Sequence, residues 1–450
     1  MNEAGSLSHW HFPPEYESRS AELLNIALDQ IGMYRSWRPY DPGLLYPTDL
    51  RYSAMPPLTK KDIREHFPNI LPSYMNVQQG LASGEITLVT TSGTTDDKIT
   101  NLWNQDWWDA SERASWTLNC HMAECATGDH HEAILVNPKN VGIASDDVDL
   151  PMEKRRVSRF LYLNEKTDPL AWSTLILNRM IAELDSFQPA VIEANPSMLA
   201  RLCRYISSTG KKVFQPRAIV FTYEYPTVLH YRQIGDVFNV PMVSSYGTTE
   251  TGYVFMQCEH GKFHQNTDFC RVDFEPFRPE HGGPLLGRIL VTPLGNPWNY
   301  MLRFKTGDLA RIDEGGSCPC GRDSGIILSS IEGRGVNLTL TCEGRLVTLA
   351  ELDQKMITIA GVDEYKLVQT DSRTFLLHVA TRRADRATLS LECVETLKDL
   401  YGNEANVTVK FESAIAPEES GKYLVSRALF PIDVELYLED RKSIGAHFDD

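Results

Sequence analysis

The side chains that could do chemistry are concentrated in one stretch, residues 243–252. A short apolar approach, residues 240–243, predicts a buried strand. It leads into an aromatic ring, a glycine, two hydroxyls and a carboxylate: Tyr246, Gly247, Thr248, Thr249 and Glu250. The glycine lets a ligand approach the backbone, the ring offers a stacking face, the hydroxyls can donate to an oxyanion, and the carboxylate can bind a hard cation. These groups could hold a purine nucleotide with Mg²⁺, and an ordinary polar turn is the structural alternative.

A second polar loop follows a β-branched segment at residues 86–90 and consists of Thr91, Ser92, Gly93, Thr94 and Thr95. Backbone N–H groups and hydroxyls at such a turn form a concave anion site that suits phosphate. Taken alone, the loop is equally well explained as a polar β-turn. It does not continue as Gly-Lys-Ser/Thr, which disfavours a Walker-type nucleotide fold.

The spacing of cysteine and histidine indicates a metal site. Cys318 and Cys320 flank one residue and are followed by glycine, a pattern typical of a metal knuckle. Cys258 and His264 complete a tetrahedral Cys₃His set for zinc, with His260 as the competing imidazole. The alternative is that these side chains are unrelated. Because the set leaves no open coordination position, we expect a structural zinc that joins two distant loops.

Three further polar groups lie in glycine-containing segments. Asp308 follows a glycine and can accept two hydrogen bonds from a ribose diol, although a β-turn is the commoner context of a Gly-Asp pair. Arg334 stands between two glycines in a segment with the composition of a linker. Lys422 also follows a glycine, on an expected loop from which it could reach into a cleft. A solvated surface lysine is the alternative.

Alternating strand-like and helix-like segments predict the scaffold that positions these groups. Buried strands are expected at 133–136, 190–192 and 218–221, with helices at 197–206 and 226–238. This alternation predicts an α/β architecture with largely parallel strands. Before it, a helical cap is expected, including a helix at 20–33 and a short helix capped by Thr59.

The pattern changes to a small α+β unit in the last part of the chain. Helices are expected at 349–357 and 387–400, and strands at 364–369, 375–380 and 407–411. We therefore expect an N-terminal domain of residues 1–332, a hinge at 333–337 and a C-terminal domain of residues 338–450 that carries Lys422.

Composition excludes several classes of function. Lys and Arg number 44 against 60 Asp and Glu, a net charge of −16, so no nucleic-acid or anionic-lipid partner is expected. No apolar run reaches the roughly 20 residues of a membrane helix, and the N-terminus does not have the pattern of a signal peptide. Nine widely spaced cysteines do not indicate a disulfide framework, so we expect a cytoplasmic protein.

Taken in order, the motifs resemble those of the adenylate-forming ligases, the superfamily of acyl-CoA synthetases and related adenylation domains. The resemblance is carried by residues 91–95, 246–250, 306–308, 333–334 and 421–422 and spans nearly the whole chain. Within the superfamily the chain is most similar to the phenylacetate–CoA ligase group. Residues 57–64 resemble that group's N-terminal signature, residues 195–197 its mid-domain turn, and the Cys₃His set the zinc knuckle of some members.

The resemblance implies a large α/β body with mixed or parallel sheets and a small mobile α+β domain. It also implies a role for each motif. The loop from Ser92 to Thr95 would wrap the ATP phosphates, Tyr246 would stack on adenine, and Thr249 would touch the α-phosphate. Glu250 would bind Mg²⁺, and Asp308 would hold the ribose with help from Arg322 or Arg334. Lys422 would bridge the attacking carboxylate and the α-phosphate.

The reaction implied is activation of a carboxylic acid, such as an aromatic one, to an acyl-adenylate with release of pyrophosphate. Transfer to a thiol would follow, in most relatives that of coenzyme A. An amine or a carrier-protein thiol as acceptor stays open, as does a non-catalytic nucleotide- or acyl-binding relative. Monomer and homodimer are both open.

Three positions depart from the family pattern. Asp96 and Asp97 stand where the family's phosphate loop continues with glycine and then lysine or proline. Two carboxylates there repel a triphosphate unless Mg²⁺ or Lys98 compensates. Val336 replaces the hinge aspartate, and a Glu-Glu pair at 418–419 replaces the usual Pro-Arg.

Overall fold

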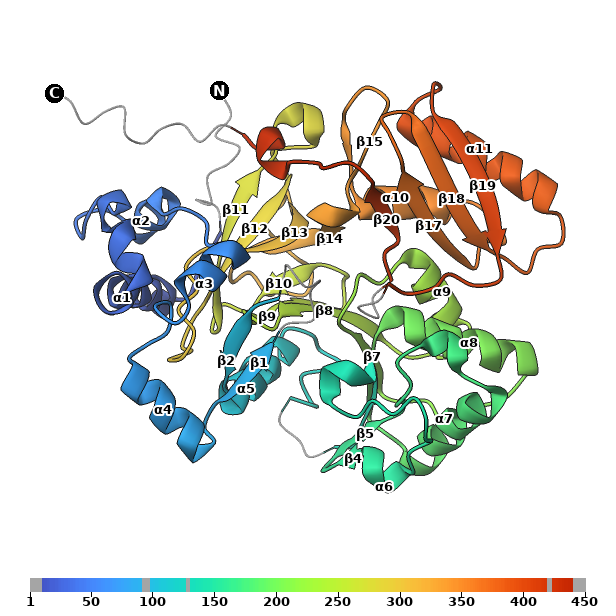
Figure 1. Cartoon of the computed structure of the whole chain (residues 1–450), viewed down its shortest axis with the longest axis horizontal. Helices are drawn as coiled ribbons and strands as arrows, with labels where there is room; N and C mark the ends of the chain where they lie inside the picture. Colours follow the sequence, from blue (N-terminus) through green and yellow to red (C-terminus); the bar gives the residue numbers. More distant parts are fainter. Residues whose placement is uncertain (1–9, 91–97, 127–129, 419–422, 440–450) are drawn as a thin grey trace. The chain divides into compact units, whose positions relative to one another are not determined.

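The computed structural model describes residues 10–90, 98–126, 130–418 and 423–439 of the chain. The chain divides into two units, each assembled from segments far apart in the sequence (Figure 1). The first unit comprises residues 1–126, 246–330 and 434–450, and the second comprises residues 127–245 and 331–433. The hinge expected at 333–337 therefore lies inside the second unit, and its role in domain movement stays a prediction.

The first unit begins with a series of helices, several of which share one core. They are α1 (Pro14–Gln30), the 3₁₀ helix η2 (Met33–Tyr40), α2 (Thr48–Ala54), α3 (Lys60–His66), α4 (Tyr74–Ser83) and α5 (Gln105–Trp116). The shared core includes residues of α1, η2, α2 and α3, whereas Val77 of α4 belongs to a separate cluster. The helix expected at 20–33 corresponds to α1, with different limits: α1 begins at Pro14, which presets the first helical φ, and ends at Gln30, because Ile31 is extended. The expected cap of α3 is also confirmed, since Thr59 and Asp62 form a reciprocal capping box.

Antiparallel strands form the rest of the first unit. The order is β11-β12-β13-β14-β10-β9. The strands are β9 (Gly252–Gln257), β10 (Phe263–Gln265), β11 (Cys270–Pro276), β12 (Leu286–Pro293), β13 (Phe304–Ile312) and β14 (Ile327–Arg334), whose last residues belong to the second unit. A separate hairpin pairs β1 (Thr87–Thr90) with β2 (Thr100–Trp103), and two 3₁₀ helices, η5 (Pro279–His281) and η7 (Val434–Tyr437), complete the unit. The core of this unit includes Phe304, at the start of β13.

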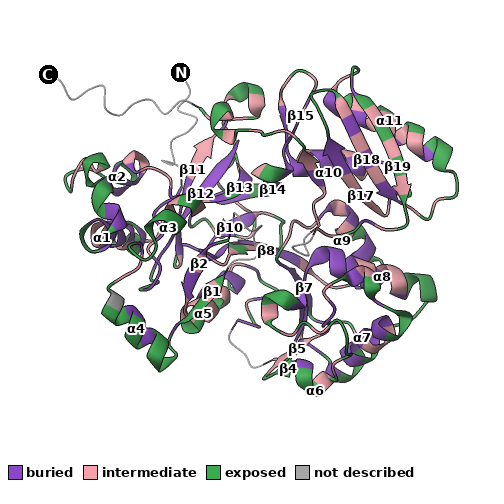
Figure 2. Cartoon of the chain, in the orientation of Figure 1, coloured by how far each residue is buried: buried purple, intermediate pink, exposed green. Residues whose placement is uncertain are grey.

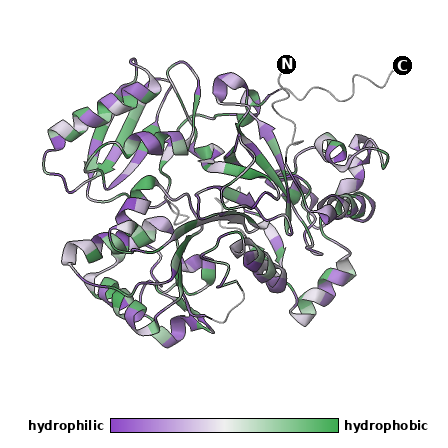
Figure 3. Ribbon diagram, turned by 180° about the vertical axis from the view of Figure 1, so that it is seen from behind, coloured by the Kyte–Doolittle hydropathy of each residue, from purple (hydrophilic) through white to green (hydrophobic). Residues whose placement is uncertain are grey.

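Parallel strands form the centre of the second unit, as the alternating pattern predicts. The order is β8-β7-β6-β3-β5-β4, parallel except for the last strand. The strands are β3 (Glu132–Leu135), β4 (Arg156–Val157), β5 (Phe160–Tyr162), β6 (Val191–Ala194), β7 (Ala218–Phe221) and β8 (Met242–Thr248), which continues into the first unit. Strands β3, β6 and β7 are buried along their whole length and are mostly hydrophobic. Figure 2 shows the burial of β7, and Figure 3 shows hydrophobic residues along the strands of the structure.

Helices cover these parallel strands and share their core. They are α6 (Met152–Arg155), α7 (Thr174–Phe187), α8 (Pro196–Thr209) and α9 (Val228–Gly235), with 3₁₀ helices η3 (Pro138–Val141) and η4 (Pro169–Ala171). Met180, Leu199 and Phe221 are buried together in this core. The helix expected at 197–206 is confirmed as α8, which begins at Pro196 and ends where Gly210 adopts φ 64°.

The same unit contains the small α+β module expected in the last part of the chain. It comprises η6 (Gly335–Asn337), β15 (Thr339–Leu340), β16 (Leu346–Val347), α10 (Leu349–Met356), β17 (Glu364–Gln369), β18 (Thr374–Ala380), α11 (Arg386–Tyr401), β19 (Asn406–Glu412) and β20 (Ser426–Ala428). Its main sheet has the order β19-β18-β17-β20. The expected hairpin is confirmed by the antiparallel pairing of β17 with β18.

No described helix combines the length and the apolar character that crossing a bilayer requires.

Candidate nucleotide and metal sites

The structure joins two of the predicted motifs through a hydrogen bond between residues 62 positions apart. Tyr246, on β8, donates its hydroxyl to Asp308 Oδ2 at 2.8 Å, and the same hydroxyl lies 3.3 Å from Thr306 Oγ1. Thr306 Oγ1 in turn accepts the backbone N–H of Asp308 at 3.1 Å. Asp308 is 7% exposed, and Tyr246 is only partly covered. The aromatic ring of Tyr246 and the carboxylate of Asp308 are thereby held next to each other in the first unit.

The glycine of the motif has a structural role that its sequence context does not indicate. Strand β8 continues through Thr248, so Tyr246 and Gly247 are strand residues and the turn begins only at Thr249. A Cβ at Gly247 would lie 2.4 Å from the carbonyl oxygen of Gly252, at the start of β9. The close approach of the neighbouring backbone therefore requires glycine here. Thr249 is partly exposed in the turn.

Glu250 is 4% exposed and has a basic partner that the sequence analysis did not identify. Its Oε1 lies 3.2 Å from Lys60 Nζ, at the first position of α3. Within the described chain, this oxygen accepts no hydrogen bond of normal geometry. A buried carboxylate oxygen held only by an ammonium group fits a Mg²⁺ ligand, because Mg²⁺ prefers carboxylate oxygens. The only available sequence signal was the position of Lys60 inside the 57–64 motif.

The four predicted zinc ligands are brought together in the first unit. Cys258 follows β9, His264 lies on β10, and Cys318 and Cys320 lie between β13 and β14. Their ligand atoms all lie within 4.8 Å of one another. Cys258 Sγ is 3.6 Å from Cys318 Sγ, and Cys320 Sγ is 3.3 Å from His264 Nε2. Tetrahedral zinc bonds of about 2.3 Å to sulfur and about 2.0 Å to nitrogen give ligand separations of roughly 3.5–3.8 Å, so the donor set fits zinc.

The protonation state of His264 also suits a metal at this cluster. Burial lowers the pKa of His264 to about 4, so its imidazole is neutral near pH 7, the form that binds metals. The competing His260 is exposed and is not part of the group.

Arg322, predicted as an aid to ribose binding, lies beside this cluster. Its Nη1 donates to both oxygens of Glu259, at 2.9 and 3.1 Å. Although burial acts to raise the pKa of Glu259, hydrogen bonds from backbone N–H groups and from Arg322 hold it near 2. Arg334 belongs to the second unit. Assistance to Asp308 by either arginine stays a prediction.

Two of the predicted groups lie outside the described residues. They are Lys422 and the phosphate loop, Thr91, Ser92, Gly93, Thr94 and Thr95.

Glu418, which stands where the family's lysine loop has a proline, has a clear local partner. Glu418 forms an ion pair with Lys366 at 2.6 Å and lies 4.0 Å from Arg427. The carboxylate therefore anchors the start of the lysine segment to β17.

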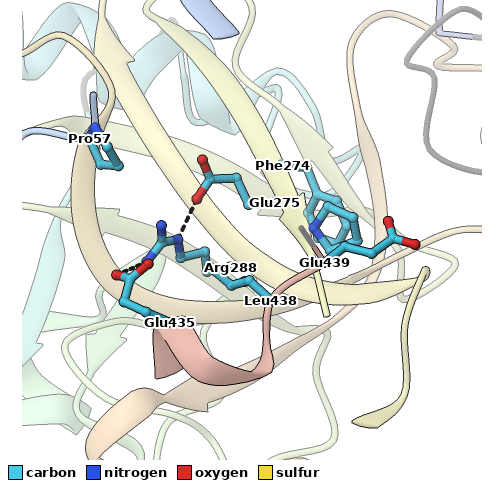
Figure 4. A pocket seen from close by; sticks show the side chains of 8 residues that line it. Pro57, Phe274, Glu275, Arg288, Glu435, Leu438 and Glu439 are labelled. Carbon is cyan, nitrogen blue, oxygen red and sulfur yellow. Dashed lines mark hydrogen bonds and ion pairs between the residues drawn. The ribbon is translucent and has the colours of Figure 1, made fainter. Parts of the chain in front are cut away.

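A cavity of about 370 Å³ in the first unit is lined by none of the predicted catalytic, nucleotide-binding or metal-binding residues, although Pro57 of the 57–64 motif contributes to it. It is lined by Pro57, Phe274, Glu275, Pro276, Arg288, Glu435, Leu438 and Glu439. Arg288 lies between Glu275 and Glu435 and bonds to both (Figure 4). Burial acts to raise the pKa of Glu435, but hydrogen bonds from Arg288 and Lys305 lower this pKa to about 2. These contacts attach the segment around Glu435 to β12 and β13.

Comparison with known proteins identifies structural relatives. No protein family model matches the sequence. The structure aligns with 2-hydroxyisobutyryl-CoA ligase, solved in the postadenylation state in complex with 2-HIB-AMP, at a TM-score of 0.67 and 18% identity, covering 94% of this chain and 91% of that one. The anthranilate CoA ligase AuaEII, in complex with anthranoyl-AMP, aligns at 0.51 and 11% identity, covering 75% and 65%.

A curated relative matches part of the sequence. Protein CapK of Staphylococcus aureus is 24% identical over 250 residues, which cover 55% of this chain and 54% of that protein. The match therefore spans about half the length of the relative.

Proposed function

This chain has the fold of the adenylate-forming ligases, and we propose that it uses ATP to convert a carboxylic acid into an acyl-adenylate with release of pyrophosphate. The acyl group would then pass to a thiol, and coenzyme A is the favoured acceptor. The observation that carries the proposal is the hydrogen bond between Tyr246 and Asp308. It combines a stacking face with a diol-binding carboxylate, the two groups that a nucleoside needs. Two structural neighbours were solved with acyl-adenylates, which supports the same class of intermediate.

The proposed nucleotide site is built on β8 and β13. The ring of Tyr246 would stack on adenine, and Asp308 would accept hydrogen bonds from the ribose hydroxyls. Thr249 would donate to the α-phosphate, and the 91–95 loop would surround the β- and γ-phosphates. Because the Tyr246 hydroxyl holds Asp308, the stacking face and the carboxylate are oriented before the nucleotide arrives.

Glu250 would hold Mg²⁺, which supplies positive charge against the phosphates when bound. In the structure, Lys60 balances the charge of this carboxylate at 3.2 Å. We infer that the lysine ammonium gives way to Mg²⁺ when the nucleotide binds and then faces the phosphates. Lys60 would thus keep a buried carboxylate paired in the absence of nucleotide, when an unpaired charge would be costly.

Lys422 would supply a further positive charge at the site. Attack of a carboxylate on the α-phosphate builds negative charge on the phosphoryl oxygens, and a fixed cation offsets that charge. The zinc proposed at Cys258, His264, Cys318 and Cys320 would take no part in this step. Four protein ligands leave no coordination position for a substrate, so its role would be to hold the two loops together.

A screen of pyrophosphate release over a panel of carboxylic acids, with and without coenzyme A, tests the proposal. The proposed activity predicts acid-dependent pyrophosphate and an AMP-linked product, followed by thioester when coenzyme A is present. Adenylate formed without thioester would direct the search to amines or a carrier protein. Failure of every acid to yield an AMP-linked species over hours would refute adenylation.

Tyr246→Phe is expected to raise the KM for ATP about tenfold with little change in kcat. The substitution keeps the stacking ring but removes the hydroxyl that holds Asp308, and a hydrogen bond to a charged group is worth about 1.5–3 kcal/mol. Steady-state kinetics with ATP as the varied substrate measures the effect. Tyr253→Phe is the matched control, because its hydroxyl donates to Glu112 at 2.6 Å outside the proposed site. An equal KM increase in both variants would contradict the assignment.

Lys60→Met is expected to increase the stabilisation of the fold by free Mg²⁺. Without the ammonium, Glu250 is left as a buried unpaired carboxylate, so the variant should lose about 1–3 kcal/mol of stability and recover part of it when Mg²⁺ binds. Thermal unfolding with and without millimolar MgCl₂ measures both effects. Lys61→Met is the control, since Lys61 pairs with Glu65 at 3.7 Å on an exposed surface. Equal Mg²⁺ shifts in the two variants would refute the pairing role.

A further inference from the structure

Residues 434–439 form a strap along the end of β11 in the first unit, and we call this segment the C-terminal strap. The backbone N–H of Arg278 donates to the carbonyl of Tyr437 at 2.9 Å, and that of Glu439 donates to the carbonyl of Pro276 at 3.0 Å. None of the residues of the strap is buried. A segment with so little buried surface has a low local stability, so the strap can be released while the sheet stays folded.

The side chain of Glu435 holds the strap to two cations of the sheet. Its Oε1 accepts hydrogen bonds from Arg288 Nη1, on β12, and from Lys305 Nζ, on β13. The Arg288 side chain is 5% exposed, whereas that of Glu435 is 48% exposed. The cations therefore belong to the stable sheet, and the carboxylate belongs to the detachable segment. Charge-assisted hydrogen bonds of this kind would hold a carboxylate from another molecule in the same way.

Arg288 would keep its place if Glu435 were removed. Its Nε donates to one oxygen of Glu275, on the neighbouring strand β11. The other oxygen of Glu275 accepts a hydrogen bond from Arg303 Nη2 at 2.7 Å. Without Glu435, the cations Arg288, Arg303 and Lys305 would share the single carboxylate of Glu275. Because buried charge is costly when it is uncompensated, this group of side chains favours another anion in the position of Glu435.

The cavity beside the two cations offers space for the rest of a ligand. Its volume is about 370 Å³, and Arg288 and Glu435 both line it (Figure 4). Glu439 also lines the cavity, but this residue is exposed, so solvent screens its charge. A cation next to apolar walls fits a carboxylate that carries an apolar body, since an inorganic anion would leave those walls unused. The apolar side chains of the lining are Pro57, Phe274, Pro276 and Leu438.

The two cations lie apart from the proposed nucleotide site. Lys305 and Thr306 are successive residues of β13, and successive side chains of a strand point to opposite faces of the sheet. Lys305 bonds to the strap, whereas the Thr306 hydroxyl lies 3.3 Å from that of Tyr246. A ligand bound by Lys305 and Arg288 would therefore lie on the other side of the strand from Thr306.

We propose that Arg288 and Lys305 form a second binding site, which takes a small organic acid with an apolar body, and that Glu435 of the strap is its internal competitor. The carboxylate of the ligand replaces that of Glu435 on the two cations, the apolar body enters the cavity, and the strap is loosened. One carboxylate replaces another, so the charge at the cations is unchanged. The inference is independent of adenylation, because it needs only the strap, the cations and the cavity.

Hydrogen–deuterium exchange on the full chain, without nucleotide and at constant ionic strength, tests the site with benzoate as the probe. Saturating benzoate is expected to speed exchange of the Arg278 and Glu439 amides about tenfold, because both are hydrogen-bonded in the pairing of the strap with β11. Benzamide has the same shape without the charge, and inorganic phosphate has the charge without the apolar body. Neither control should change the exchange of these amides.

Variants at the cations and at the competitor test the same site by calorimetric titration with benzoate. Glu435→Gln should bind benzoate about tenfold more tightly than the wild type, because the competing carboxylate no longer occupies the site. Lys305→Met should bind benzoate about tenfold more weakly, because one of the two charge-assisted bonds is lost. Glu22→Gln is the matched control, since Glu22 is an exposed carboxylate of α1, and it should bind like the wild type.

Equal benzoate affinity in the wild type, Glu435→Gln and Lys305→Met would overturn the inference. Unchanged exchange of the Arg278 and Glu439 amides at saturating benzoate would also overturn it, because benzoate would then be bound elsewhere. An effect of benzamide or phosphate equal to that of benzoate would refute the assignment of the ligand as an organic acid with an apolar body.

Discussion

Replacing Lys422 with alanine is expected to lower the rate of pyrophosphate release about 10²–10³-fold, the usual loss when one preorganised charge-stabilising group is removed. The substitution removes the cation that would meet the developing charge on the α-phosphate. It leaves Tyr246, Asp308 and Glu250 unchanged, so the affinity for ATP should stay within a few-fold of the wild type. Pyrophosphate release and calorimetric titration with ATP and Mg²⁺ measure the two effects separately.

Lys410→Ala provides the control for loss of positive charge from the same module. Lys410 is exposed on β19, so its removal should leave adenylation at the wild-type rate. The comparison also separates the ligase from a non-catalytic nucleotide-binding relative. Such a relative would bind ATP with equal affinity in all three proteins and release no pyrophosphate in any of them. Wild-type activity in Lys422→Ala would refute the role of this lysine.

Replacing Cys318 with serine is expected to remove the zinc and to lower the free energy of unfolding by more than about 4 kcal/mol, as loss of a structural metal does. Cys318 lies 3.6 Å from Cys258, across two loops that the metal would join. Without the metal, the remaining thiols and the imidazole would be held only by weak polar contacts. Elemental analysis of the purified protein and denaturant unfolding measure the two effects.

Cys342→Ser is the control, because Cys342 lies in the second unit and outside the cluster. It should leave the metal content at one zinc per chain and change the free energy of unfolding little. Full zinc occupancy in Cys318→Ser would show that the metal, if present, is bound elsewhere. A structural role further predicts that protein lacking zinc loses stability before it loses activity.

The sequence by itself determined the elements whose energies are local. The buried strand at 218–221 and the strand at 364–369 have the same limits in the sequence pattern and in the structure. The first is an apolar run too short for a helix and rich in β-branched and aromatic residues, and the second begins with alternating polar and apolar side chains, so both patterns favour a strand. The cap of α3 was predictable for the same reason, since Thr59 and Asp62 satisfy each other within one turn. The cysteine spacing likewise identified a set of ligands that the fold brings within 4.8 Å.

Only the tertiary structure decided which of these groups meet. The bond from Tyr246 to Asp308, the pairing of Lys60 with Glu250, and the bond from Arg288 to Glu435 all cross long stretches of chain. No local periodicity encodes such contacts, because their distances are set by the packing of whole strands and helices. The same packing explains why β8 continues through Thr248: the backbone of β9 lies against Gly247, and this contact, which is absent from the local sequence, keeps the motif extended.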